Sequence, residues 1–298
     1  MTLLHPKITH TSQVLPENEA VLIVHGDDRP GLVTAISNLI STAGGNIISL
    51  DQYSDDPEGG HFFQRTVFRV DDLDAVRPEL EASFAKVLGE LGLEWDLYDR
   101  SQPKRVAILA SASDHCLLDL LWRQRRGEIP MVISMVISNH TAVANDVRQF
   151  GIPFFHVPSG GPDKAAAEAQ IVKLLAGNVD LVVLARYMQI LSSGFLANVG
   201  VPVINIHHSF LPAFIGAGPY RKAKERGVKL IGATAHYVTE ELDEGPIIEQ
   251  DVVRVTHEDS VADLQRRGAD VERQVLSRAV AWHCEDRVVR NGRETIVF

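Results

Sequence analysis

The sequence predicts an α/β protein in which two different arrangements of strands and helices follow one another. Of the 298 residues, 45% are hydrophobic and 23% are charged, as in an ordinary globular chain. The first hundred residues place a helix, a hairpin and a second helix between short strands, whereas the rest alternate apolar strands with helices. A chain of this length is expected to form two domains.

The first part has the order strand, helix, strand, strand, helix, strand. The segment "LVTAISNLISTA" carries its apolar residues at helical spacing and is followed by Gly44 and Gly45, which are typical of a helix C-terminus. The turn "DDPEGG" joins two strands into a hairpin. This order is the ferredoxin-like βαββαβ plan. We therefore expect strands at 20–26, 46–54, 61–70 and 93–99, and helices at 32–43 and 74–92.

The domain boundary is expected at "RSQPK", a polar segment with a proline that follows a complete small unit. The expected parts are an N-terminal extension at 1–18, a first domain at 19–99, a linker at 100–104 and a second domain at 105–298.

The second part has continuous apolar strands separated by amphipathic helices, which is typical of a Rossmann-like, mostly parallel sheet covered on both faces. The expected strands are 105–111, 131–138, 153–158, 180–186 and 201–207, with helices near 114–126, 141–150, 163–177 and 189–198. Later strands at 231–239 and 246–255, a long helix at 260–286 and a hairpin turned at Asn291-Gly292 complete the chain.

Composition argues against several classes of protein. The net charge of −10 argues against a nucleic-acid partner. The two cysteines, Cys116 and Cys284, are far apart without metal-type spacing, so we expect no disulfide and no metal site. No signal peptide and no membrane-length apolar run are visible in the sequence, and we expect a cytoplasmic protein.

Polar residues interrupt the end of one apolar strand. Asn205 and His207 lie two apart at the carboxyl end of "VPVINIH", where ligands bind in open α/β sheets. Asp243 lies in the acidic, turn-like segment "HYVTEELDEGPI". An amide can donate to an oxyanion, an imidazole can act as an acid, and a carboxylate can orient that imidazole or activate water. Spacing alone leaves catalysis and a structural role equally open, and a structural role is favoured for His208 and His236.

Three segments resemble the folate-dependent formyltransferase fold, over about residues 104–285: "DLVVLARYMQILS", "INIHHSFLPAFIGAGPY" and "GATAHYVTEELDEGPIIEQ". The resemblance implies a catalytic trio of Asn205, His207 and Asp243. It also implies a folate pocket, with pterin packing on "MQIL" and mostly backbone contacts from the acidic loop; core packing is the alternative for the apolar residues. The implied pocket residues are Met188, Ile190, Leu191, Glu240 and Glu244.

Three members of this family differ in features that the sequence would show. A glycinamide ribonucleotide transformylase would need a glycine-rich phosphate loop, where this chain has "LASASDHCL". A methionyl-tRNA formyltransferase would need a basic C-terminal domain. "DDRPGLVTAISNLISTAGGNI" is similar to an ACT domain, and together with "HHSF" it resembles the formyltetrahydrofolate deformylase family. "GAGPYRKA" (216–223) departs at Gly218 and Arg221 from the "GARPYHQA" expected there, which puts substrate contacts of this segment in doubt.

This resemblance implies hydrolysis of 10-formyltetrahydrofolate to tetrahydrofolate and formate, which would supply formate for purine synthesis and balance the one-carbon folate pools. No cofactor is implied beyond the folate substrate. Asn205 and protonated His207 would stabilise the oxyanion, and Asp243 would hold the imidazolium and take the proton of water. Independently of the resemblance, His208 and Ser209 are candidates for positioning water. A folate-dependent transferase, or a non-catalytic regulator that binds folate or an amino acid, is the alternative.

The ACT resemblance implies regulation by an amino acid, with glycine and methionine as effectors. Backbone N–H groups near Gly31 and Leu32 would take the carboxylate, and Asn46 of a neighbouring unit the amino group. Asp28 and Arg29 belong to the same turn. The glycines are equally well explained as turn and cap residues. Because ACT domains pair side by side, we expect a homo-oligomer, either a dimer or a tetramer.

Overall fold

The computed structural model describes residues 15–56, 58–159, 164–213 and 218–298, and these form two compact units. One unit contains Lys104–Cys284, and the other joins Val14–Pro103 to Glu285–Phe298. We had expected the second domain to extend to residue 298, but the last residues group with the N-terminal unit. Most of the expected extension at 1–18 lies outside the described residues.

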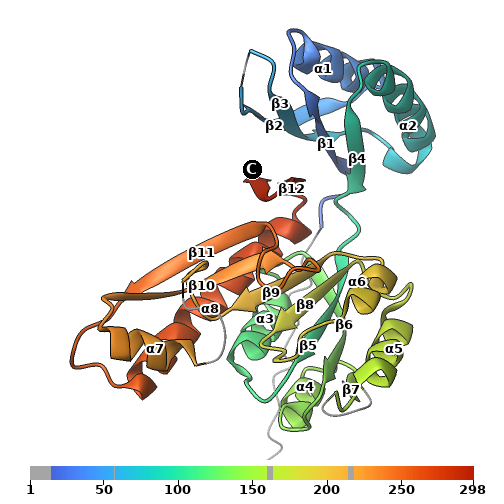
Figure 1. Cartoon of the computed structure of the whole chain (residues 1–298). Coiled ribbons are helices and arrows are strands. Elements are labelled where there is room, and N and C mark those ends of the chain that lie inside the picture. Colours follow the sequence, from blue (N-terminus) through green and yellow to red (C-terminus); the bar gives the residue numbers. More distant parts are fainter. Residues whose placement is uncertain (1–14, 57, 160–163, 214–217) are drawn as a thin grey trace, which may run out of the picture. The chain divides into compact units, whose positions relative to one another are not determined.

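The N-terminal unit has the expected βαββαβ order, and its antiparallel sheet has the strand order β2-β3-β1-β4. Figure 1 shows both helices on one side of this sheet. The elements are β1 (Glu19–Asp27), α1 (Leu32–Thr42), β2 (Asn46–Ser54), β3 (His61–Arg69), α2 (Leu73–Glu90) and β4 (Glu94–Asp99).

The helix α2 shows how local sequence and packing agree. The Asp72 side chain accepts a hydrogen bond from the Ala75 N–H and so caps the helix. Leu80, Phe84 and Leu88 recur at helical spacing and are buried in the core between the helices and the sheet. This apolar face holds the helix against the sheet, since burial of one such side chain contributes roughly 1.5–3 kcal/mol.

The opposite face of the same sheet is partly covered by the C-terminal hairpin, β12 (Val288–Asn291) and β13 (Glu294–Val297). Val289 packs with Val21 and Phe63 of the sheet. The Arg65 guanidinium donates to the carbonyl oxygens of Glu285 and Asp286, each at 2.9 Å. The hairpin is therefore part of the N-terminal unit.

The second unit contains a seven-stranded sheet in the order β11-β10-β9-β8-β5-β6-β7. The strands from β5 to β9 pair in parallel and β10 and β11 are antiparallel, which confirms the expected mostly parallel sheet. The strands are β5 (Lys104–Ala110), β6 (Met131–Ser138), β7 (Phe154–His156), β8 (Leu181–Ala185), β9 (Val203–His207), β10 (Leu230–Tyr237) and β11 (Ile247–Arg254).

Helices cover both faces of this sheet (Figure 1). Those on one face include α5 and α6, whereas α3 and α8 contact each other on the opposite face. The helices are α3 (His115–Arg125), α4 (Ala144–Gln149), α5 (Lys164–Leu175), α6 (Ser193–Val199), α7 (Pro219–Arg226) and α8 (Val261–Cys284). Among the described residues, no helix is long and apolar enough to cross a membrane.

Two helices differ from the sequence-based expectation. The helix expected near 189–198 begins only at Ser193, because the Ser192 side chain caps it by accepting from Phe195 N–H. Residues after β8 therefore form a loop at the sheet edge. The helix α7 was not expected; it starts with Pro219 and lies between two glycines in the left-handed conformation.

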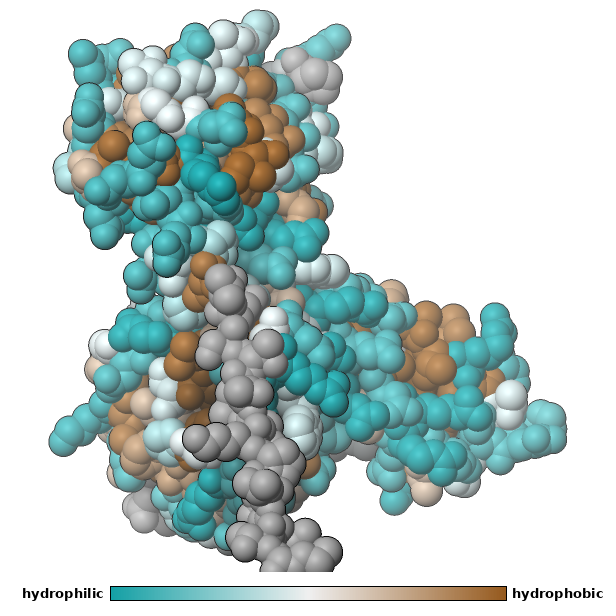
Figure 2. All heavy atoms as spheres, turned by 180° about the vertical axis from the view of Figure 1, so that it is seen from behind, coloured by the Kyte–Doolittle hydropathy of each residue, from teal (hydrophilic) through white to brown (hydrophobic). Residues whose placement is uncertain are grey.

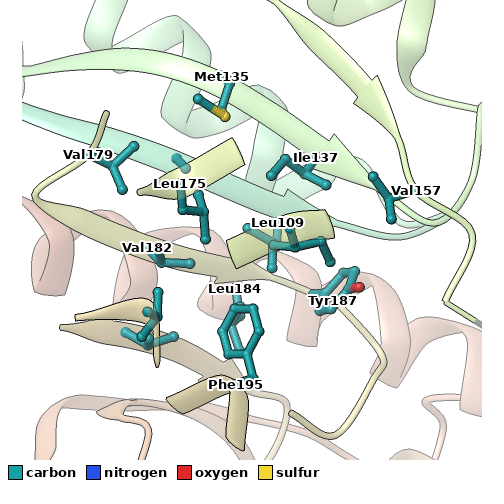
Figure 3. Packing of buried hydrophobic residues seen from close by; sticks show 14 of the residues in the cluster. Leu109, Met135, Ile137, Val157, Leu175, Val179, Val182, Leu184, Tyr187 and Phe195 are labelled. Atoms are coloured by element: carbon teal, nitrogen blue, oxygen red, sulfur yellow. The ribbon is translucent and has the colours of Figure 1, made fainter. Parts of the chain in front are cut away.

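Side chains from the strands and from α5 and α6 form one hydrophobic cluster (Figure 3). Leu109 and Leu184 come from adjacent strands, and Leu175 and Phe195 come from the two helices. Tyr187, directly after β8, is also buried in this cluster. The cluster fixes the position of β8 and of the loop that follows it, which borders the candidate site.

Candidate active site

Asn205 and His207 lie at the carboxyl end of β9, as expected. The antiparallel neighbour β10 pairs His236 with Asn205 and Thr234 with His207. Directly opposed residues on neighbouring strands point to the same face of a sheet. The pairing of β9 and β10 therefore brings a second histidine beside Asn205.

Asp243 reaches the same place from the loop between β10 and β11. The base of this loop is closed by a hydrogen bond from Tyr237 N–H to the Pro246 carbonyl, at 2.9 Å. Asp243 itself has a left-handed backbone conformation, with φ of 59°. Its Oδ1 lies 3.2 Å from His207 Nδ1 and 3.8 Å from His236 Nε2. The loop thus brings the three residues of the predicted trio together.

The two ring nitrogens of His207 differ in their hydrogen bonding among the described residues. Its Nδ1–H donates to Asp243, and this hydrogen bond lowers the pKa of the Asp243 carboxyl against the opposing effect of burial. Asp243 is therefore ionised at neutral pH. His207 Nε2 is buried and has no hydrogen-bond partner among the described residues. A buried polar atom of this kind needs a ligand or water as its partner.

His236 orients the amide of Asn205. Its Nδ1 lies 2.9 Å from the Tyr237 carbonyl oxygen, which only accepts, so Nδ1 carries the proton. Burial lowers the pKa of His236, and the imidazole is neutral. Its Nε2 therefore accepts from Asn205 Nδ2, at 3.2 Å. Sequence reasoning had favoured a structural role for this residue and missed its contact with Asn205.

A cavity of about 390 Å³ opens beside these residues. Of the pocket residues that the resemblance implied, it is lined by Met188, Ile190, Leu191, Glu240 and also His208. Met188 and Ile190 are 57% and 60% exposed, so they are not core residues. Glu244 is exposed and does not line the cavity within the described part of the chain. The cavity wall also includes Gln189 and Leu242, which belong to the two segments that the resemblance implied, and Tyr187, Val238 and Thr239, which sequence reasoning had not named.

His208 follows the trio on the chain and lines a second cavity as well as the first. Burial, assisted by the charge of Arg186, lowers the pKa of His208 to about 4. The imidazole is therefore neutral near pH 7. Its ring centre lies 5.3 Å from that of His207.

Part of the unusual segment 216–223 borders the same region. Residues 216 and 217 lie outside the described residues. Gly218 adopts a left-handed conformation, which glycine tolerates without strain, and lines both cavities. Arg221 lines the second cavity.

The expected effector residues lie in the N-terminal unit. Gly31 precedes α1 with φ of 94°, and Leu32 is buried in the core. The Asp28 carboxylate accepts from the Ser54 hydroxyl, and Arg29 donates to the Leu91 carbonyl. Asn46 is exposed at the start of β2.

Comparisons with known proteins match both units. The ACT domain model matches residues 20–85 and the formyl transferase model matches residues 104–280. The chain is 60% identical to a formyltetrahydrofolate deformylase of Mycobacterium bovis, over 93% of this chain and 90% of that protein. The chain belongs to the formyltetrahydrofolate deformylase family. The resemblance inferred from the sequence is thereby confirmed.

Other members of the deformylase family are similar over the whole chain. A formyltetrahydrofolate deformylase of Bacillus subtilis is 47% identical, over 95% of this chain and 94% of that protein. The crystal structure of a deformylase from Pseudomonas syringae pv. tomato has a TM-score of 0.89 at 45% identity and covers 95% of each chain. A glycinamide ribonucleotide transformylase from Symbiobacterium toebii matches at 36% identity with a TM-score of 0.63, over 68% of this chain and 98% of that chain.

Proposed function

We propose that this protein hydrolyses 10-formyltetrahydrofolate to tetrahydrofolate and formate. The observation that carries the proposal is the hydrogen bond from His207 Nδ1 to Asp243, which leaves His207 Nε2 buried and, among the described residues, without a hydrogen-bond partner in the cavity that Asn205 also lines. The relatives that span nearly the whole chain and bear the name deformylase support this choice over a transferase. Release of formate would supply a one-carbon unit for purine synthesis.

The folate would occupy the cavity beside the trio. Its pterin ring would pack against the exposed side chains of Met188 and Ile190 and the half-buried side chain of Leu191, since ligand sites combine apolar walls with a few placed polar groups. Glu240 and its neighbours in the acidic loop would contribute mainly backbone contacts. The formyl group would then face Asn205 and His207.

The reaction begins when water attacks the formyl carbon. A new C–O bond forms, and negative charge develops on the formyl oxygen. Protonated His207 donates from Nε2 to this oxyanion, and Asn205 donates the amide N–H that His236 does not use. Asp243 stabilises the imidazolium and takes the proton that water loses. The C–N10 bond then breaks, N10 receives that proton, and the formic acid product ionises to formate.

Incubation of the purified protein with 10-formyltetrahydrofolate tests the proposal. Formate should accumulate in the absence of any acceptor. Transfer of the formyl group that requires glycinamide ribonucleotide and releases no formate would instead identify a transferase. Tight folate binding without any reaction would identify a regulator.

We further propose that the N-terminal unit binds an amino acid such as glycine or methionine. No described side chain caps α1, so the N–H groups of its first turn are available to a carboxylate near Gly31 and Leu32. Asn46 of a neighbouring unit would bind the amino group of the amino acid. Isothermal titration calorimetry with each amino acid tests this proposal, and the absence of heat with both would contradict it.

Pairing of N-terminal units would form a dimer or a tetramer. Figure 2 shows hydrophobic residues gathered in places on the surface of this unit. The edge strand β2 exposes Ile48, Leu50 and Tyr53, and an exposed edge strand favours pairing with another chain. Light scattering after size-exclusion chromatography measures the oligomeric state, and a monomer at micromolar concentration would contradict this proposal.

A further inference from the structure

A second cavity, of about 790 Å³, adjoins the candidate folate cavity. His208 and Gly218 line both cavities and so form their common wall. The second cavity is lined by three cationic side chains and two carboxylates, namely Arg186, Arg221, Lys222, Glu225 and Glu272. Cationic side chains therefore outnumber carboxylates in the lining of the cavity that lies beyond His208 and Gly218.

Arg186 carries two unfavourable features at once. It follows β8 directly and has a left-handed backbone, with φ of 61°, which is rare for a residue other than glycine. Its Nε and Nη1 are buried and have no hydrogen-bond partner among the described residues. Strained backbone conformations cluster at functional sites, where the surrounding structure holds them in place, and a buried donor without a protein partner needs a ligand or water.

Glu272 holds the Arg186 guanidinium in place by charge, without accepting a hydrogen bond from it. Arg186 Nε lies 3.5 Å from Glu272 Oε2, which is an ion pair but no hydrogen bond. The carboxylate is already bonded to His115 Nε2 at 2.7 Å and to the Tyr220 hydroxyl at 2.6 Å. Burial opposes its ionisation, yet these partners and Arg186 together lower the pKa of Glu272. Glu272 is therefore an ionised anchor, and the guanidinium remains able to bind a second anion.

We infer that this second cavity is the product site, where Arg186 binds the formate that leaves the trio past His208. The inference rests on the proposed hydrolysis. A guanidinium can donate two parallel hydrogen bonds to the two oxygens of a carboxylate, which is the shape and charge of formate. The same cations disfavour the ammonium form of an amine acceptor. Formate would thereby be separated from the folate that still occupies the first cavity.

Titration of the folate-free protein with ¹³C-formate, followed by NMR line broadening, tests the inference. Arg186→Gln should weaken formate binding about tenfold or more, because it removes a charge-assisted hydrogen-bond donor. Arg186→Lys should bind with intermediate affinity, since it keeps the charge beside Glu272 but loses the planar fork. Arg254→Gln, on β11 and outside the cavity, should bind formate as the unchanged protein does.

Thermal unfolding of each variant shows whether it is folded, and only folded variants are compared. Equal formate affinity in Arg186→Gln and the unchanged protein would overturn the inference. So would the absence of saturable formate binding, or tighter binding of inorganic phosphate or acetate than of formate at the same site.

A turnover assay separates this inference from the proposed function. If formate binding depends on Arg186 but 10-formyltetrahydrofolate is not hydrolysed, the anion site is supported and the proposed hydrolase function is wrong. If 10-formyltetrahydrofolate is hydrolysed and formate inhibits the unchanged protein and Arg186→Gln equally, the hydrolase function is supported and the anion site is wrong. If both proposals hold, added formate slows turnover, and Arg186→Gln needs about tenfold more formate for the same effect.

Discussion

His236 and Asn205 form a pair in which a neutral imidazole determines the direction of an amide. The Tyr237 carbonyl fixes the proton on His236 Nδ1, so Nε2 can only accept from Asn205. The second N–H of the Asn205 amide would then be left for the formyl oxygen of the proposed substrate. A protonated His236 would turn a donor toward the Asn205 N–H and reverse the amide. Burial of the imidazole prevents this at neutral pH.

Replacement of Asn205 by alanine removes one of the two proposed donors to the oxyanion. We expect kcat of Asn205→Ala to fall by about 10²–10³, as is typical of such a donor, with little change in the Kd for folate. Stopped assays of formate release and equilibrium folate binding measure the two quantities. Asn145→Ala, at an exposed position on α4, is the control and should behave like the unchanged protein. Unchanged kcat in Asn205→Ala would refute this role.

Replacement of His236 by glutamine changes the partner of Asn205 and leaves the other groups of the trio in place. Because His236 acts as a positioning residue, we expect kcat to fall about tenfold with KM unchanged. The double variant with Asn205→Ala should lose little more than Asn205→Ala alone, since coupled residues are not additive. Fully additive losses would show that His236 acts independently of Asn205. His257→Gln, on an exposed histidine, is the matched control.

Protonation of His208 should destabilise the folded protein in mild acid. Its pKa is lowered from 6.5 to about 4, so the unfolded chain binds the proton at a higher pH than the folded chain. The stabilisation is complete above pH 6.5 and is lost as the pH falls toward 4, by on the order of 2 kcal/mol at pH 5. Denaturant unfolding at pH 7.5 and pH 5 measures this difference in the free energy of unfolding. His208→Gln should lose less stability between these pH values, and an equal loss would contradict the assignment.

The sequence allowed the prediction of Asn205 and His207 from their place at a strand end, and of Asp243 with the help of the family resemblance. His236 was missed because its contact with Asn205 depends on the antiparallel pairing of β10 with β9, which no local pattern indicates. Arg186 was missed because the sequence does not reveal a left-handed conformation at the end of β8.

At the scale of elements, the loop between β10 and β11 determines whether the trio is assembled. Gly245 packs against the end of β10, and a Cβ at this position would lie 1.7 Å from the Tyr237 carbonyl oxygen. This oxygen belongs to the backbone of β10 and cannot move aside as the end of a flexible side chain can. Glycine is therefore required where the loop returns to the sheet, two residues after Asp243.

Gly245→Ala should displace the loop and separate Asp243 from His207. We expect kcat to fall by at least tenfold while the far-ultraviolet circular dichroism spectrum stays unchanged, because the loop moves and the sheet does not. Gly89→Ala is the control, since a Cβ added there on α2 meets no atom within 4 Å. A fully active Gly245→Ala enzyme would show that the loop position is not critical.

The strands β5, β6 and β8 were predictable because each is a nearly continuous apolar run, and the observed bounds differ from the expected ones by only a few residues. The helix α7 was not, because "PYRKAKER" is too polar to show an apolar periodicity. Its glycine caps were the available signal. The start of α6 was misplaced because the Ser192 cap competes with the helical pattern of the preceding loop.

At the scale of the whole molecule, the chain contains two units whose boundaries do not follow the sequence in order. Residues 285–298 complete the N-terminal unit after the second unit has intervened. The sequence showed the hairpin but gave no indication of the unit to which it belongs. Its few apolar residues find their partners on a sheet more than two hundred positions earlier.

A protein that ends at Cys284 should retain the second unit but have a less stable N-terminal unit. The deletion exposes Val21 and Phe63 and leaves Arg65 without its two carbonyl acceptors. We expect a loss on the order of 3 kcal/mol, equivalent to one or two buried apolar side chains. Differential scanning calorimetry should show one transition at lower temperature and one unchanged. Two unchanged transitions would show that the hairpin does not stabilise this unit.

The C-terminal hairpin also determines the order in which the protein can be completed on the ribosome. The N-terminal sheet emerges first, but the residues that cover its second face are made only after Lys104–Cys284. All of Lys104–Cys284 is translated in between, which takes on the order of 10–40 s at typical rates of synthesis. Throughout this interval Val21, Ile23, Phe63 and Val67 lack the contacts of the hairpin, so the nascent chain presents an apolar surface to chaperones until residues 285–298 have been made.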